Sequence, residues 1–481
     1  MKLIFAFWTL LCALTFSPLS PAHAADFKTL AAGGAGGWLN TTRPLTTEDM
    51  QGRLVLLDFW TYGCVNCMNV VPDLEYLENT FGDQLLVIGV HSAKFKGEEG
   101  NDRILDAARR FGLKHPVIND SDYAIWKSYN VRAWPTFVLL GPDGKEIQRF
   151  IGEGQRTAME GVIKTNLKNV TNTTSLSSVI MGKEKTGTLS FPARLAMDKE
   201  GLIYIADSGH NRIVVSDQQG KIQYIIGSGQ KGLKDGSYNN AAFNLPRGLA
   251  LAGAHLYVAD TNNHAIRRID LEKKSVETIA GNGTKGQISS PWDLEPMSDG
   301  QSMAVAMAGR HQLWSLNIHS QQLSPLAGTG KEALTDGRQS EATLAQPSGL
   351  IDTGTALFFV DAESSALRML EAGNVKTLIG TGLFDFGFKD GTYPEARLQH
   401  PQGLAADGNY VYIADTYNDA IRLYNRKSGE LSTLALPEGS LKEPGDVLLN
   451  DRTLWIADTN HHALKAYNID SKELSEISLN P

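Results

Sequence analysis

Cysteine is scarce in this chain of 481 residues and occurs only at Cys12, Cys64 and Cys67. So few cysteines exclude a framework of structural disulfides, which needs several pairs. Long basic runs are also lacking, and the net charge of -8 argues against binding to nucleic acid. Beyond residues 3–16 no apolar run is long enough to span a bilayer, so stable membrane insertion is not expected.

The first 24 residues have the pattern of a signal peptide. Lys2 supplies a short positive region, residues 3–16 form an apolar region, and a small-residue cleavage site ends at Ala24. We therefore predict a signal peptide over residues 1–24 and a periplasmic or secreted protein. An uncleaved membrane anchor is the alternative, although the apolar region is short for a spanning helix.

Cleavage after Ala24 removes Cys12 and leaves Cys64 and Cys67 as the remaining cysteines. A Cys-x-x-Cys pair in an exported protein is either a redox site or half of a metal site. A metal site needs two further ligands, and His91 and His115 are the candidates nearby in the sequence.

Residues 25–170 alternate between patterns typical of strands and of helices. Apolar runs at 54–57, 85–90 and 136–140 indicate buried strands, and helical spacing lies between and after them. This alternation predicts an α/β sheet covered on both faces. The polar residues 170–177 are interpreted as a linker.

Residues 171–481 contain a unit that occurs six times, at intervals of roughly 43 to 56 residues. Each unit has an upstream proline, a strand, a pattern resembling Ile-Ala-Asp-Thr-x-Asn-x-Ala-Ile-Arg, and another strand. One four-stranded blade per unit predicts an all-β propeller of six blades, whose closure removes exposed sheet edges. The Asp of the pattern, replaced by Met in the third unit, lies at Asp207, Asp260, Met307, Asp361, Asp415 and Asp458. The upstream prolines are Pro192, Pro246, Pro291, Pro347, Pro401 and Pro444.

Two segments compete for the outer strand of the last blade. Residues 179–181 resemble other outer strands, and residues 474–479 at the C-terminus have a suitable pattern as well. Both alternatives stay open at the level of the sequence pattern.

The surroundings of the cysteine pair are typical of a reactive thiol. A buried strand leads into Cys64, which is predicted to start a helix, and Cys67 lies one turn further. A helix N-terminus favours a thiolate, and the thiolate is the attacking species in disulfide exchange. We predict that Cys64 is the nucleophile and Cys67 the resolving thiol; an inert disulfide is the alternative.

The segment 57–67 resembles thioredoxin at positions beyond the pair. Asp58 matches the buried acid beneath the pair, which helps to deprotonate the resolving cysteine, and Pro72 matches the proline that kinks the active-site helix. The loop at Pro135 matches the cis-proline loop that lies against the disulfide, so the resemblance predicts a cis bond before Pro135. The alternatives are an ordinary strand-end carboxylate for Asp58 and a simple turn at Pro135.

The chain as a whole resembles the family of thioredoxin-like, NHL-repeat-containing proteins. The resemblance implies an α/β thioredoxin-like domain over residues 25–170 and an all-β six-bladed NHL β-propeller over residues 171–481. Relatives often carry a further cysteine at the position of Gly63, and some have an additional C-terminal β-domain and lack a signal. The segments that carry the resemblance are Trp38-Leu39-Asn40, Phe59-Trp60-Thr61-Tyr62, Cys64-Val65-Asn66-Cys67, Val90-His91-Ser92-Ala93-Lys94-Phe95, Lys234 and Lys389.

These observations predict an exported thiol-disulfide oxidoreductase that acts on protein thiols or disulfides. Its catalytic residues would be Cys64, Cys67, Asp58 and Pro135, with no cofactor and no bound metal. The propeller would recruit a protein substrate or partner, and a membrane protein is a candidate electron donor or acceptor. The alternative is a non-enzymatic interaction scaffold with a structural or redox-sensing thioredoxin-like module.

The histidines of the propeller suggest a third hypothesis, a metal-dependent hydrolase or lyase. His264, His311 and His462 share one repeat position in three units, and His210 and His461 are offset by one residue. Some NHL propellers that resemble this one hold a metal on the central axis, as in a peptide-amidating lyase. The turn of the repeat explains these histidines without a ligand, so a protein-binding platform is the preferred interpretation.

Overall fold

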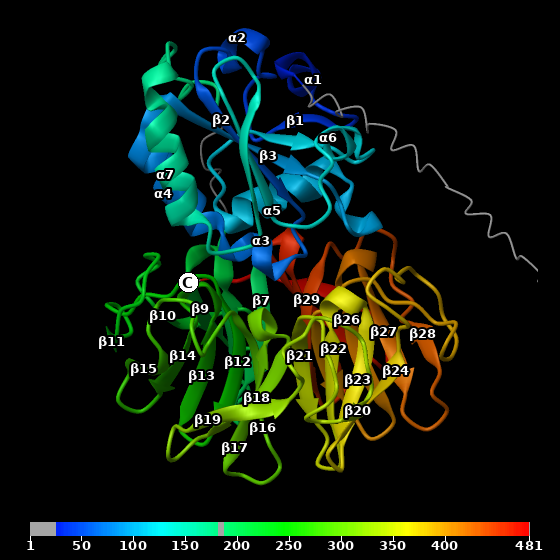
Figure 1. The fold of residues 1–481 in the computed structure, drawn as a ribbon. Coiled ribbons are helices and arrows are strands. Elements are labelled where there is room, and N and C mark those ends of the chain that lie inside the picture. Colours follow the sequence, from blue (N-terminus) through cyan, green and yellow to red (C-terminus); the bar gives the residue numbers. More distant parts are fainter. Residues whose placement is uncertain (1–25, 181–186, 481) are drawn as a thin grey trace, which may run out of the picture.

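The computed structural model shows an α/β domain seated on one end of a β-propeller (Figure 1). It describes residues 26–180 and 187–480. The predicted signal peptide, residues 1–24, and Cys12 within it lie outside the described residues. The predicted fold class, an α/β domain followed by an all-β propeller of six blades, is confirmed.

The α/β domain is built on a six-stranded sheet with the strand order β1-β4-β3-β2-β5-β6. All seven residues of β2 and of β3 are buried, and these two strands pair in parallel at the centre of the sheet. β2 places alternate residues on the two faces, where helices cover them. The strands are β1 Gly37–Leu39, β2 Leu54–Trp60, β3 Leu85–His91, β4 Val117–Asn119, β5 Thr136–Leu140 and β6 Glu146–Ile151.

The predicted helix after the cysteine pair is divided into α3 and α4 at Val70. Pro72 lies in the first turn of α4, where its missing N–H removes no intrahelical hydrogen bond. Residues 25–52, which look loop-rich in the sequence, contain two short helices and β1. The helices are α1 Phe27–Ala32, α2 Thr47–Met50, α3 Val65–Asn69, α4 Val71–Phe81, α5 Asn101–Phe111, α6 Ala124–Ser128 and α7 Arg156–Asn166.

The segment interpreted as a linker packs against the α/β domain. The amides of Thr171 and Asn172 donate to the carbonyl of Gly52 at 2.7 and 2.9 Å. Leu176 and Val179 are buried in the same cluster as residues of β2 and α1. The chain therefore follows the first domain to at least residue 179 before it enters the propeller.

Each of the six blades is a sheet formed from one continuous stretch of chain. The extra strands β11 Gly236–Ser237 and β20 Gly337–Arg338 extend the second and fourth blades. The first three blades are β7 Pro192–Met197, β8 Ile203–Asp207, β9 Arg212–Ser216 and β10 Ile222–Ile226; β12 Pro246–Ala252, β13 His255–Asp260, β14 Ala265–Asp270 and β15 Ser275–Gly281; and β16 Pro291–Pro296, β17 Ser302–Met307, β18 Gln312–Asn317 and β19 Leu323–Ala327. The last three are β21 Pro347–Asp352, β22 Leu357–Asp361, β23 Ala366–Glu371 and β24 Asn374–Ile379; β25 Gly403–Ala406, β26 Tyr410–Asp415, β27 Ala420–Asn425 and β28 Leu431–Thr433; and β29 Pro444–Asn450, β30 Thr453–Asp458, β31 Ala463–Asn468 and β32 Leu474–Ile477.

The C-terminal segment supplies the outer strand of the last blade, because β32 pairs with β31. Ile180 instead bridges to Thr41 of the α/β domain. The ring closes where β29 meets β7, and the hydroxyl of Thr459 donates to the carbonyl of Pro192 at 2.7 Å. The structure thus decides between the two candidate segments.

The Asp of the repeat is a buried structural residue. In blade 2, Asp260 accepts the amide of Asn244 at 2.8 Å and the guanidinium of Arg267 at 2.8 Å. Blade 3 has Met307 at this position, and its sulfur lies 3.3 Å from the amide nitrogen of Ser289. The sulfur thus occupies the place of the carboxylate while the rest of the turn is kept.

Candidate redox site between the domains

One residue from each blade faces the α/β domain. Each precedes the first proline of its blade, and each has a left-handed backbone with φ between 47° and 64°. In every case the backbone amide of this residue donates a hydrogen bond to a side chain of the preceding blade. That side chain belongs to the last residue of the turn that follows the second strand. We call these residues the docking ring: Phe191, Leu245, Ser290, Gln346, His400 and Glu443.

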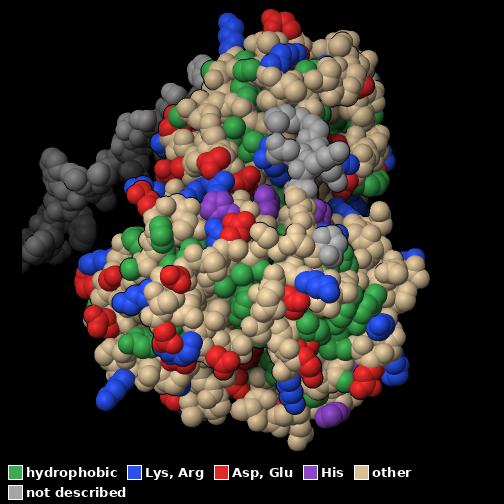
Figure 2. Space-filling view, turned by 180° about the vertical axis from the view of Figure 1, so that it is seen from behind, with side chains coloured by type: hydrophobic (Ala, Val, Ile, Leu, Met, Phe, Trp, Pro, Cys, Tyr) green, Lys and Arg blue, Asp and Glu red, His purple; other side chains and the backbone are tan. Residues whose placement is uncertain are grey.

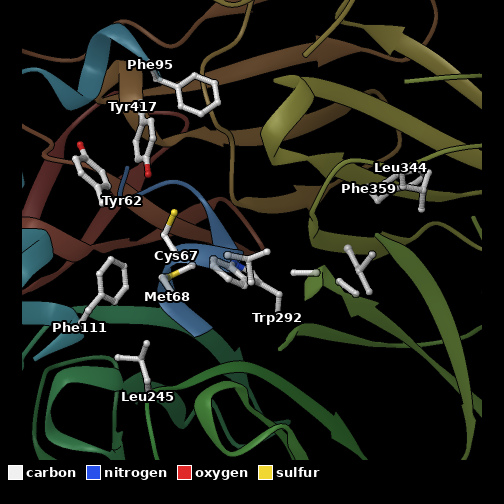
Figure 3. Packing of buried hydrophobic residues seen from close by; sticks show 14 of the residues in the cluster. Tyr62, Cys67, Met68, Phe95, Phe111, Leu245, Trp292, Leu344, Phe359 and Tyr417 are labelled. Carbon is white, nitrogen blue, oxygen red and sulfur yellow. The ribbon is translucent and has the colours of Figure 1, made fainter. Parts of the chain in front are cut away.

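The side chains of the docking ring contact the α/β domain around the cysteine pair. The hydroxyl of Ser290 donates to Asn69 Oδ1 at 2.8 Å, and the hydroxyl of Tyr62 donates to Glu443 Oε1 at 2.8 Å. Leu245 belongs to a buried cluster that joins both domains, shown in Figure 3 together with Cys67. The cysteine pair therefore faces the propeller.

Cys64 and Cys67 lie at the start of α3, as the sequence predicts. Cys64 is the N-cap residue and half-buried, whereas Cys67 is 3% exposed. Both are free thiols, and the amide of Cys67 donates to the carbonyl of Cys64 at 3.1 Å. Burial raises the pKa of Cys67 well above its ordinary value, and the hydrogen bond to Cys64 adds to the rise. One thiol is thus partly exposed, and the other is buried and held protonated.

Two propeller side chains hold the backbone on both sides of Cys64. Gln346 Nε2 donates to the carbonyl of Gly63 at 2.9 Å, and the amide of Val65 donates to Gln346 Oε1 at 2.9 Å. His400 Nε2 lies 3.2 Å from the same carbonyl, which only accepts, so this nitrogen carries the proton. Burial lowers the pKa of His400 to about 4, which keeps the ring neutral.

Glu98 supports the same loop from within the α/β domain. It accepts the amide of Gly63 at 2.7 Å, the amide of Lys94 at 3.0 Å and the hydroxyl of Thr61. Burial raises the pKa of Glu98 to about 7, although these hydrogen bonds oppose the rise. A side chain at Gly63 would place its Cβ 2.8 Å from Glu98 Oε1, so a residue other than glycine requires this carboxylate to move.

Asp58 lies in the middle of β2, and its charge raises the pKa of Cys67. Burial raises the pKa of Asp58 to about 7, although the charge of His115 opposes the rise. His115 Nδ1 lies 3.3 Å from Glu78 Oε1, and Glu78 is partly exposed. Asp58 is therefore a buried acid with a pKa near neutral pH, and the charges of His115 and Glu78 both act on it.

Pro135 follows Trp134 through a cis peptide bond, which confirms the predicted backbone conformation. It lies directly before β5, beside β2 in the sheet. Trp134 is half-buried and packs against the cluster that contains Cys67. The catalytic roles assigned to Pro135, Asp58 and the two cysteines stay predictions.

A buried ion pair crosses the interface beside Cys64. Lys94 and Glu363 are bonded to each other, and both side chains are almost fully buried. Burial lowers the pKa of Lys94, but the charge and the hydrogen bond of Glu363, together with smaller contributions from Glu332 and Cys64, raise it on balance. The lysine thus places a positive charge near the predicted nucleophile.

The histidines of the propeller bind backbone amides. Nδ1 of His264, His311 and His462 accepts the amide of Ser290, Gln346 and Phe191, respectively, at 3.0 to 3.2 Å. His210 and His461 lie 2.9 and 2.7 Å from the repeat Asp of their own blades. Among residues 26–180 and 187–480, no group of three or more His, Cys, Asp or Glu side chains is arranged to hold a metal ion.

A cavity of about 850 Å³ lies between the domains over blades 1, 2 and 6. Basic side chains line it from both domains, among them Arg110, Lys114, Arg212 and Lys231. Figure 2 shows histidine and charged side chains gathered along the junction between the domains. The residues that line the cavity do not include Cys64 or Cys67, which lie on the side of blades 4 and 5.

Comparison with known proteins identifies both domains. Residues 52–146 match the family model described as thioredoxin-like, and residues 189–215 and 243–269 match the NHL repeat. NHL repeat-containing protein 2 from Homo sapiens is 38% identical over 83% of this chain and 62% of its own length. The chain thus contains a thioredoxin-like domain and NHL repeats, and it is similar to NHL repeat-containing protein 2 over most of its length.

Two further relatives bear on the thioredoxin-like domain. Protein SUPPRESSOR OF QUENCHING 1, chloroplastic, from Arabidopsis thaliana is 38% identical over 83% of this chain and 41% of its own length. Thiol-disulfide oxidoreductase ResA from Bacillus anthracis is 28% identical over 25% of this chain and 68% of its own length. The chain thus spans less than two thirds of the length of NHL repeat-containing protein 2 and of SUPPRESSOR OF QUENCHING 1. Among the described residues, no helix is long and apolar enough to cross a membrane.

Sequence reasoning missed the docking ring, although its signal was present. The six upstream prolines stand out in the sequence, and the residue before each is Phe, Leu, Ser, Gln, His or Glu. The proline is constant, but the residue before it differs in chemistry from blade to blade. This pattern indicates that the backbone of that residue maintains the repeat, whereas its side chain makes a contact outside the repeat. Glu98 and the interface lysine Lys94 were likewise not singled out as site residues.

Proposed function

We propose that this protein is a thiol-disulfide oxidoreductase for protein clients, with Cys64 as the nucleophile. The observation that carries the proposal is the half-buried Cys64 at the start of α3, with the buried Cys67 one turn further. Disulfide exchange needs one thiol that attacks a client and a second thiol close enough to attack the first, and Cys64 and Cys67 have this arrangement. The relationship to Thiol-disulfide oxidoreductase ResA supports the same chemistry.

In the reducing direction, the Cys64 thiolate attacks one sulfur of a client disulfide and forms a mixed disulfide. The other client sulfur leaves as a thiolate and takes a proton from solvent. Asp58, with a pKa near 7, accepts the proton of Cys67, whose thiolate then attacks the Cys64 sulfur. The second client thiol leaves, and two electrons have passed from the pair to the client. Oxidation of a client runs through the same steps in reverse.

The decisive experiment measures disulfide exchange by the full chain and its cysteine variants. Reduction of insulin disulfides with dithiothreitol as the electron source is expected for the wild type and is expected to be lost in Cys64→Ser. Cys67→Ser is expected to accumulate a mixed disulfide through Cys64, which is detected by non-reducing electrophoresis. A wild type without exchange activity and a Cys67→Ser variant without mixed disulfides would rule the proposal out.

Export belongs to the same proposal. The sequence pattern of residues 1–24 supports a periplasmic or secreted location, with a membrane protein supplying or receiving the electrons. Expression of the full precursor in a Gram-negative host, followed by fractionation and N-terminal sequencing, is expected to give a mature protein that starts at Ala25. A precursor that stays uncleaved in the cytoplasm contradicts this assignment.

One observation favours the alternative of an interaction scaffold with a structural or redox-sensing module. Val65 and Cys67 are buried between the domains, and propeller side chains bind the backbone on both sides of Cys64. A scaffold predicts that Cys64→Ser and Cys67→Ser keep cellular function, while changes on the propeller surface abolish it. Complementation of a deletion strain with these variants separates the two functions.

A further inference from the structure

The loop that connects blades 4 and 5 carries an unusual group of exposed aromatic side chains. Phe384 is 73% exposed, Phe388 is 59% exposed, and Tyr393, which follows shortly after, is 56% exposed. These are among the most exposed large apolar side chains in the described part of the chain. Exposed apolar groups of this size, gathered in one place, are typical of an interaction surface.

The same loop occurs twice more in the propeller and provides an internal comparison. Residues 227–236 and 328–337 form the corresponding loops, which are shorter than residues 380–391, and all three end in the same Asp-Gly turn. Between the first glycine and the Asp-Gly turn, the two sister loops contain no aromatic residue. The loop at 380–391 has Phe384, Phe386 and Phe388 there.

The structural role of these loops is carried by their aspartates. Asp235, Asp336 and Asp390 accept the buried guanidinium groups of Arg267, Arg368 and Arg422, respectively, at 2.7 to 3.0 Å. Each aspartate also accepts a threonine hydroxyl from the neighbouring outer strand. The guanidinium of Arg422 also lies 4.7 Å from the ring centroid of Phe388. The sister loops nevertheless fold in this way without phenylalanine, so the aspartate contacts of the repeat do not require the exposed rings of Phe384 and Phe388.

The loop lies on the side of the interface where Cys64 is found. Phe386 packs against Phe95 of the thioredoxin-like domain, with ring centroids 4.9 Å apart. Lys94 Nζ lies 5.2 Å from the ring centroid of Phe384. Phe95 also packs against His400, whose Nε2 lies 3.2 Å from the carbonyl of Gly63, the residue before Cys64. The large interdomain cavity, in contrast, lies over blades 1, 2 and 6. The exposed rings are thus continuous with the interface next to the predicted nucleophile.

We propose that Phe384 and Phe388 form a docking surface for an apolar, extended segment next to the disulfide of an incompletely folded protein. This inference rests on the proposed function. Cysteines are among the most buried residues of folded proteins, so a disulfide that is open to attack belongs to a chain whose apolar side chains are also exposed. Such a chain can place apolar side chains on the two rings while its disulfide reaches Cys64.

The test compares a large and a small substrate on the full-length protein. The double variant Phe384→Ser with Phe388→Ser is expected to raise the KM for scrambled ribonuclease about tenfold, because two apolar contacts are lost. Its kcat/KM for glutathione disulfide, which has no apolar side chain to place on the rings, is expected to stay unchanged. Phe384→Leu with Phe388→Leu is expected to restore the KM, since leucine keeps an apolar surface.

Ile151→Ser is the matched control. Ile151 is 60% exposed on β6, far from the propeller loop in the chain and with no part in the repeat, so its replacement is expected to leave both substrates unaffected. A double serine variant that handles both substrates like the wild type overturns the inference, and so does one that loses activity toward both equally.

A second measurement separates this inference from the proposed function. Fluorescein-labelled, S-carboxymethylated ribonuclease is unfolded and has no disulfide, so its binding, followed by anisotropy, needs no redox chemistry. The wild type is expected to bind it, and the double serine variant is expected to bind it at least about tenfold more weakly. If the wild type binds this probe but does not exchange disulfides, the proposed function fails and the docking surface stands. Binding of phosphatidylglycerol vesicles that depends on Phe384 and Phe388, with no change in the ribonuclease measurements, makes the loop a membrane contact and overturns the inference.

Discussion

The two domains contribute to their shared interface in different ways. The thioredoxin-like domain uses neighbouring segments, chiefly residues 60–69, residues 91–98 and α5. The propeller uses one position from each of six blades, and these positions are about fifty residues apart in the chain. One side of the interface is therefore local in sequence, and the other exists only when the ring is closed.

The docking ring shows how a repeat combines a constant role with a variable one. The backbone amide of each of its residues has the same kind of partner in all six blades. The side chains differ, and each fits what it meets on the thioredoxin-like domain. The repeat Asp behaves in the opposite way, because its side chain is the constant part. Substitutions at the two kinds of position are expected to have different consequences.

The largest effect is expected at the constant position. Asp415→Ala removes the buried one of the two carboxylates that pair with Arg422, as well as the acceptor for the amide of Gln399. The expected loss is about 4 kcal/mol in the free energy of unfolding, measured by denaturant titration. Met307→Leu at the equivalent position of blade 3 is the control and is expected to cost less than about 1.5 kcal/mol. Equal costs for the two variants would contradict a constant structural role.

Asp58→Asn tests the thioredoxin-like side. Its pKa is about 7 in the folded protein and 3.8 in the reference state, so the folded protein holds an extra proton between these pH values. The contribution of this proton to the free energy of unfolding is fully present below about pH 4 and is lost as the pH rises through about 7. Asn cannot ionise, so the variant is expected to be more stable than the wild type at pH 8, by on the order of 3 kcal/mol, and similar at pH 4.

Thermal unfolding across this pH range measures the effect of Asp58→Asn. Resolution of the mixed disulfide by Cys67 is expected to become slower in the variant, because no carboxylate accepts the thiol proton. Asp143→Asn, on the exposed turn between β5 and β6, is the control and is expected to leave the pH profile of stability unchanged. A difference between Asp58→Asn and the wild type that does not grow with pH would disprove the assignment.

Glu443→Gln tests the docking ring. Gln keeps an acceptor for the Tyr62 hydroxyl but removes the charge that lies 3.7 Å from Arg103 and 3.6 Å from Arg110. The expected loss is about 2 kcal/mol in the free energy of unfolding, because two cations at the interface lose a buried carboxylate. Glu277→Gln, in the exposed pair with Arg268, is expected to cost less than about 0.5 kcal/mol in the same titration. A loss at Glu443 no larger than this would mean that the pairs across the interface do not stabilise it.

The smallest effect is expected from Gln346→Ala, and it concerns the redox chemistry. Without Gln346, the Val65 amide is free to stabilise the Cys64 thiolate, which favours the reduced pair. The reduction potential is expected to become less negative by up to about 30 mV, which corresponds to about 1.4 kcal/mol. Titration against glutathione buffers measures it.

Gln399→Ala is the matched control, because Gln399 binds the amide of Gly97 across the same interface at 2.9 Å, away from Cys64. Its reduction potential is expected to equal that of the wild type. A shift toward more negative values in Gln346→Ala, or the same shift in both variants, would show that Gln346 does not act through the backbone at Cys64.

Most of the fold could be predicted from the sequence because its signals are local. Short apolar runs indicated the strands of the first domain, and the repeated unit indicated the six blades of the second. The kink near Pro72 was expected from the resemblance to thioredoxin, whereas the packing of residues 171–180 on the first domain was not predicted. This packing depends on contacts with a distant segment, such as the bonds of Thr171 and Asn172 to Gly52.

The resemblance to thioredoxin predicted the cis bond before Pro135, and the sequence by itself determined the Cys-x-x-Cys motif around Cys64 and the sixfold repeat. Each of these depends on residues that are neighbours in the chain or on a regular interval. Only the tertiary structure decided that β32 completes the last blade, that the histidines bind amides between blades, and that Gln346 and His400 hold the backbone at Cys64. The physical reason is that these contacts join residues hundreds of positions apart, and they form only after the ring has closed and the thioredoxin-like domain is seated on it.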